Sequence, residues 1–98
     1  YLHGEHFLGD DSNQWLTDGH EKYIWYSQTG RELLFDLDTD PTELRDLSTS
    51  RPEGLRLCRE RLVAELAGRE EGFVEGDALV VGRPQGPTLA DAGQYRER

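Results

Sequence analysis

The stretch KYIWYSQTGRELLFDLDTDPTEL, residues 22–44, contains two runs of aromatic and aliphatic residues separated by a short polar loop. The first run extends back to position 20 as HEKYIWYS, and its alternation predicts a strand with Tyr23 and Trp25 on one face. The residues expected on the other face are Lys22, Ile24 and Tyr26. We interpret the aromatic side chains as core and cross-strand pairs, although a ligand-stacking platform is the alternative.

A second strand is predicted at residues 32–37, ELLFDL, after a hairpin loop at 28–31. Leu33, Phe35 and Leu37 of this run face one way. The second strand therefore follows the first in an antiparallel arrangement.

Two further strands are predicted upstream. Residues 14–17, QWLT, precede Asp18-Gly19, and an Asp-Gly pair between strand-like runs predicts a type I′ hairpin turn with positive φ at both central positions. A weaker strand pattern lies in YLHGEHFL, residues 1–8. We therefore expect an antiparallel meander of about four strands within residues 1–37, with one face covered.

Helices are predicted downstream of the sheet. Asp40 as N-cap, Pro41 at the first helical position and Glu43 as capping-box partner predict a short helix at 41–47. A capping box of Ser50 and Glu53 opens a longer helix at 51–68. Its apolar stripe, which should lie on the sheet, consists of Leu55, Cys58, Leu62 and Leu66.

The expected fold class is α+β, with the meander packed against the longer C-terminal helix. Residues 73–82 favour one more short strand or an extended arm, and 83–98 favour an irregular tail. The 98 residues allow a single domain, which we place at 1–82.

Composition excludes several classes of protein. A net charge of −9 argues against a nucleic-acid binder and against docking on an anionic membrane, and no apolar run is long enough for a transmembrane helix. Cys58, the single cysteine, cannot form an intramolecular disulfide and is interpreted as a buried apolar residue. This favours a cytoplasmic location, although the sequence leaves the compartment open. Because the chain begins at Tyr1, we interpret it as part of a longer protein.

No known catalytic motif is present. The sequence has no GxGxxG, no GxxxxGK[ST] and no CxxC. Asp36 to Glu43 contains four acidic residues, but the sixth position of an EF-hand loop would be Pro41, so helix capping explains these acids better. We therefore assign no catalytic and no metal-ligating residue.

A cluster of polar residues near the N-terminus is the one suggestive feature. HGEH places His3, Glu5 and His6 close together, and His20 is expected nearby across the hairpin. Three interpretations stay open: metal ligation, lining of a polar cleft shared with another domain, or simple exposure to solvent. The spacing differs from HExxH, and on a strand His3 and His6 point to opposite faces.

The combined motif over residues 1–48 resembles the C-terminal subdomain of bacterial arylsulfatases, within the formylglycine-dependent sulfatases of the alkaline-phosphatase-like superfamily. That family pattern runs TDGxxKYIW, a glycine loop, then LFDLxxDPxExxxL. The resemblance covers residues 1–66 well and extends more loosely through 70–84. The matching residues are Thr17, Asp18, Gly19, Lys22, Tyr23, Ile24, Trp25, Leu34, Phe35, Asp36, Leu37, Asp40, Pro41, Glu43 and Leu47.

The resemblance implies a parent enzyme that hydrolyses sulfate esters with a formylglycine and a calcium or magnesium ion. Those groups belong to the N-terminal catalytic domain of the family, which is the expected partner of this chain. Cys58 lies in LRLCRERL, which is not the CxPSR modification motif, so we expect no cofactor here. The chain would close the fold and wall the substrate cleft, with His3, Glu5, His6, His20 and Lys22 as candidate contacts.

Two alternatives accompany this interpretation. The parent would instead be a phosphonate or phosphate monoester hydrolase of the same superfamily, whose C-terminal segments look similar. Alternatively, the chain is a free-standing interaction module. We also expect weak self-association of the excised domain, because part of its apolar surface would lack its natural cover.

Overall fold

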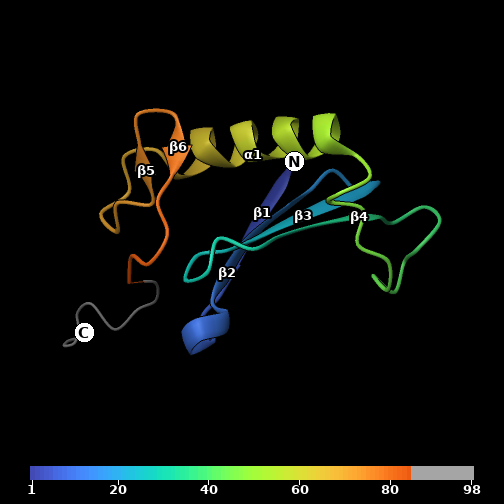
Figure 1. The fold of residues 1–98 in the computed structure, drawn as a ribbon, viewed down its shortest axis with the longest axis horizontal. Helices are drawn as coiled ribbons and strands as arrows, with labels where there is room; N and C mark the ends of the chain where they lie inside the picture. Colours follow the sequence, from blue (N-terminus) through green and yellow to red (C-terminus); the bar gives the residue numbers. More distant parts are fainter. Residues whose placement is uncertain (85–98) are drawn as a thin grey trace.

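A four-stranded antiparallel sheet forms the centre of the computed structural model, which describes residues 1–84 (Figure 1). The strands follow chain order and are β1 (Leu2–His6), β2 (Asn13–Thr17), β3 (Glu21–Tyr26) and β4 (Glu32–Asp36). A 3-10 helix, η1 (Gly9–Asp11), joins the first two strands. The predicted α+β fold with a four-stranded meander is confirmed.

Strand register divides the sheet residues into two faces. On one face, His3, Leu16, Tyr23 and Leu34 form a row across all four strands. The next row on that face consists of Glu5, Gln14, Trp25 and Glu32. Tyr23 and Trp25 therefore share a face, as the alternation of the sequence predicts.

Helix α1 (Pro52–Leu66) lies along the face that carries these two rows (Figure 1). The core between sheet and helix is formed by Leu16, Tyr23, Trp25, Leu34, Cys58, Leu62, Leu66 and Phe73. The interpretation of Cys58 as a buried residue is confirmed, since it is 6% exposed. No helix in the part of the chain that the structure describes is long and apolar enough to span a bilayer.

The start of α1 differs from the predicted capping box. Arg51 occupies the N-cap position without a side-chain cap, and Pro52 follows at the first helical position. The Ser50 hydroxyl instead donates to the Leu47 carbonyl at 3.3 Å, and the Glu53 carboxylate pairs with Arg56. The helix begins one residue later and ends two residues earlier than predicted, because the chain leaves helical geometry at Ala67.

The helix predicted at 41–47 is wrong. Asp40 does cap the chain, since its carboxylate accepts the N–H groups of Leu44 and Arg45 at 3.0 and 2.8 Å. Glu43, however, has a φ of +59°, which interrupts right-handed helical geometry. The segment then follows the edge of β4, where the Leu47 N–H donates to the Leu34 carbonyl at 2.7 Å.

The hairpin between β2 and β3 is present, but its turn is not type I′. Thr17 pairs with Lys22, so the loop holds four residues rather than two. Gly19 has a φ of +93°, whereas Asp18 is not among the described residues with positive φ. The Asp18 carboxylate accepts the N–H groups of His20 and Glu21 instead, which favours the longer loop.

The predicted extended arm at 73–82 is a small hairpin. Its strands are β5 (Val74–Glu75) and β6 (Ala78–Leu79), and Phe73 just before them is fully buried against the core. The hairpin lies beside the C-terminal end of α1 (Figure 1). The tail predicted at 83–98 lies outside the described residues from position 85 onward.

Candidate functional site

The candidate residues from the sequence lie in three separate places. His3 and Glu5 are on the helix-covered face of β1, whereas His6 and Lys22 are on the opposite face. His20 is in the loop between β2 and β3. The structure therefore does not bring the five residues into one cluster.

His3 and Glu5 belong to a hydrogen-bonded chain on the helix side. The amide oxygen of Gln14, which is fully buried, lies 2.6 Å from His3 Nε2, and its amide nitrogen donates to Glu5 at 2.7 Å. Arg69, just beyond α1, lies 2.9 Å from the same Glu5 oxygen and also binds Glu71. These contacts satisfy a buried amide and tie β1 to the end of the helix.

His6 and Lys22 lie on the opposite face beside Trp15. The Lys22 ammonium is 5.1 Å from the centre of the indole ring, and the His6 ring centre is 6.5 Å from it. Lys22 also binds the Glu43 carboxylate at 3.2 Å. Its charge is therefore partly neutralised within the chain, and the prediction of an anion contact by Lys22 stays untested.

His20 is well exposed, with 72% of its side chain accessible to solvent. Its Nδ1 lies 3.1 Å from both carboxylate oxygens of Asp38. This hydrogen bond, together with the charges of Asp38 and Asp18, raises the pKa of His20 above its ordinary value. The loop therefore presents a histidine that holds its proton more readily than usual.

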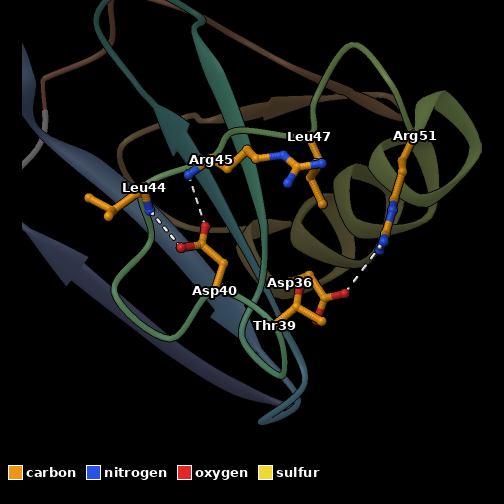
Figure 2. A pocket seen from close by; sticks show the side chains of 7 residues that line it. All are labelled: Asp36, Thr39, Asp40, Leu44, Arg45, Leu47 and Arg51. Atoms are coloured by element: carbon orange, nitrogen blue, oxygen red, sulfur yellow. Dashed lines mark hydrogen bonds and ion pairs between the residues drawn. The ribbon is translucent and has the colours of Figure 1, made fainter.

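A hollow of about 270 Å³ lies beneath the segment that leaves β4 (Figure 2). Both acidic and basic side chains line the hollow. Asp40 accepts hydrogen bonds from the backbone of the loop, and Arg51 lies 3.4 Å from Asp36. The lining residues are Asp36, Thr39, Asp40, Leu44, Arg45, Leu47 and Arg51. Sequence reasoning missed this hollow because it predicted a helix across the segment that forms its wall.

A partly buried ionic group joins the sheet to the helix. The Arg59 guanidinium binds Glu32 through two nitrogens at 2.6 and 2.8 Å, and the Tyr23 hydroxyl donates to Glu32 at 2.7 Å. Burial opposes ionisation of Glu32, but the hydrogen bonds from Arg59 and Tyr23 hold its pKa below the ordinary value. Burial also raises the pKa of Tyr23. This group has the geometry of a structural ion pair.

The described residues show no arrangement suited to the cofactors implied by the resemblance. Among residues 1–84 there is no group of three histidine, cysteine or acidic side chains that could hold a metal ion. Cys58 is buried in α1, where desolvation raises the pKa of its thiol to about 11. Residues 1–84 therefore do not fit a metal or a formylglycine, and we assign no reaction step to either group here.

Comparison with known proteins gives one informative match. The chain is 44% identical over 86 residues to a protein named arylsulfatase from Clostridium perfringens (strain 13 / Type A). The match covers 86% of this chain but 18% of that relative, so the chain spans less than a fifth of the relative's length. No family model matches the chain.

Proposed function

We propose that this chain, which is 44% identical over 86 residues to a protein named arylsulfatase, forms a non-catalytic part of a larger enzyme that hydrolyses sulfate esters. The observation that carries this proposal is that the motif residues make contacts within the fold of this chain. Those that support the resemblance are occupied in holding the sheet, its loops and the helix together. They are structural residues of a segment whose chemistry would come from elsewhere in the longer protein.

The two halves of the motif contact each other directly. Lys22 of the KYIW half binds Glu43 of the DPxE half at 3.2 Å. Leu47, the last motif position, donates its N–H to the carbonyl of Leu34 on β4. The Lys22–Glu43 pair explains why these two residue types stand at this spacing, whereas the Leu47 contact is made by the backbone and sets the path of the segment.

We propose His20 as the candidate with the best access to a substrate cleft shared with the longer protein. It is exposed at the end of a hairpin, and its neighbour Asp38 favours the protonated ring. A protonated imidazole donates hydrogen bonds to an anionic ester. In this proposal the role of His20 is substrate positioning, whereas His3, Glu5 and Lys22 serve mainly the fold.

Hydrolysis of an aryl sulfate tests the proposal. We expect no turnover by the 98-residue chain and clear turnover by the longer protein that contains it. An aryl phosphate and a phosphonate monoester, assayed in parallel, decide between the sulfatase and its sister hydrolases. Turnover by the short chain after removal of contaminating sulfatase, or a longer protein that prefers the phosphorus esters, would contradict the proposal.

The role of His20 is tested in the longer protein with His20→Gln. Loss of one charge-assisted contact at the rim of the cleft should lower kcat/KM by roughly tenfold, mainly through KM. Thr29→Ala, in the exposed loop between β3 and β4, is the matched control and should leave both constants unchanged. Equal kinetics for the two variants would remove His20 from the substrate cleft.

A further inference from the structure

The sheet face opposite α1, here called the open face, is covered by neither α1 nor the β5–β6 hairpin. The segment after β4 reaches one end of it, where Glu43 binds Lys22 and Phe35 is 6% exposed. Helix α1 and the β5–β6 hairpin both pack on the opposite side, against the core (Figure 1). Register assigns to the open face the positions Leu2, Gly4, His6, Asn13, Trp15, Thr17, Lys22, Ile24, Tyr26, Leu33 and Phe35. Its central row is apolar throughout, because Gly4, Trp15, Ile24 and Leu33 lie side by side.

The open face contains no acidic residue, although the chain has 20 of them. The helix-covered face, in contrast, carries acidic residues in both rows that flank the row of Leu16 and Tyr23, and arginines bind these acids. These acids are Glu5, Glu21, Glu32 and Asp36. An acid does reach this face from outside the sheet, since Glu43 binds Lys22 at 3.2 Å. Strand positions that carry no acid of their own, in a chain of net charge −9, indicate a region that is not built for solvent alone.

Trp15 gives a second, independent indication. Its indole lies flat against Gly4, where an added Cβ would be 2.1 Å from the ring. The indole Nε1 is covered, and among residues 1–84 it has no hydrogen-bond partner. An unpaired buried donor costs about 1–3 kcal/mol. The described part of the chain therefore leaves a polar group of this face unsatisfied.

We infer that the open face is the surface on which the remainder of the longer protein docks, through apolar contacts along its central row. This inference rests on the proposed function, because it needs a longer protein. The matched relative extends far beyond the aligned segment, which is 18% of its length. The rest of such a chain is covalently tethered, so its effective concentration at the face is high.

The size of the open face suits a contact between domains. Four strands about 4.8 Å apart, with five residues rising about 3.3 Å each, span roughly 300 Å² of sheet. Covering that area would bury about 600 Å² from both partners, at the lower end of the range for contacts between domains. A second copy of this chain is a poorer occupant, because each copy carries a net charge of −9.

The test compares Ile24→Glu, at the centre of the open face, with Leu57→Glu on α1. Leu57 is 55% exposed and lies outside the open face, which makes it the matched control. Both variants are made in the 98-residue chain and in the longer protein, and thermal unfolding is measured in all four. Ile24→Ala in both contexts removes the apolar contact without adding a charge.

We expect Ile24→Glu to destabilise the longer protein far more than the short chain, and to expose the segment to protease at least about tenfold faster. Leu57→Glu should have the same small effect in both contexts. Equal effects of Ile24→Glu in both contexts would overturn the inference, as would a dimer of the longer protein that uses this face. Aryl sulfate turnover is measured separately, so an inactive protein with a protected open face would contradict only the proposed function.

Discussion

Alternate residues of the same four strands point to opposite faces of the sheet, and the two faces are stabilised differently. On the helix side, the Trp25 ring packs edge-on against Phe73 with ring centres 5.8 Å apart, and Glu32 binds Arg59. On the open face, Trp15 lies on Gly4, and its indole nitrogen has no hydrogen-bond partner among residues 1–84. The comparison teaches that the helix-side face is packed and paired within residues 1–84, whereas the open face carries a polar group without a partner in that part of the chain.

The largest expected difference between the faces is in core packing. Trp25→Ala removes a side chain that is 2% exposed and should lower the free energy of unfolding by about 3–5 kcal/mol. Ile24→Ala changes the neighbouring residue in the strand, which points to the open face, and should cost about 1 kcal/mol in the 98-residue chain. Urea unfolding of both variants measures this. Similar costs would mean that the open face is covered within the chain.

The ionic group on the helix side gives a pH-dependent prediction. Because the pKa of Glu32 is lowered in the folded state, its stabilising effect is present above its unfolded pKa and is lost as the pH falls through the folded pKa. Glu32→Gln should cost about 1–3 kcal/mol at pH 7 and should reduce the loss of stability between about pH 5 and pH 3. Unfolding curves at several pH values test this, and an unchanged acid limb would contradict it.

Two glycines, one near each face, provide a matched pair. Gly4→Ala should displace the Trp15 ring and cost about 1–3 kcal/mol, since the new Cβ would overlap it. Gly54→Ala in α1 meets Leu34 Cδ2 at an ordinary 3.7 Å and should stabilise the chain by about 0.5–1 kcal/mol. Thermal unfolding compares the two variants. A stabilising Gly4→Ala would show that Trp15 does not rest on the sheet.

The smallest effect concerns His20, which belongs to neither face. Its pKa is raised first by the hydrogen bond to Asp38, so Asp38→Asn should lower that pKa toward the ordinary histidine value. NMR titration of the His20 ring protons measures the change. A His20 titration that is unaffected by Asp38→Asn would show that the pair does not form in solution.

Strand positions could be predicted from the sequence because alternation and glycine loops are local signals. The pattern of Tyr23 and Trp25 assigns them to one face, and the Leu55-to-Leu66 stripe indicates the helix. The helix at 41–47 was mispredicted because Asp40 and Pro41 make the same local contacts at a turn as at a helix start. What decides between the two is the pairing of Glu43 with Lys22, which lies 21 positions away.

The candidate site could be predicted less well. Proximity in the sequence grouped His3, Glu5 and His6, but strand geometry separates His6 from the other two, as the sequence also implies. The roles of Gln14 and Arg69 could not be foreseen, since they depend on how the end of α1 approaches β1. The sequence alone predicts only that part of the apolar surface lacks its natural cover. The absence of acidic residues at the open-face positions becomes visible only from the strand register.

Side-chain oxidation by hydroxyl radicals, read by mass spectrometry, tests the central claim most directly. It compares the 98-residue chain with the longer protein at Tyr26 and Leu2 on the open face, with Leu57 on α1 as the control. The account predicts that oxidation of Tyr26 and Leu2 falls at least about fivefold in the longer protein while that of Leu57 is unchanged. Protection of Leu57 with continued oxidation of Tyr26 and Leu2 would contradict it.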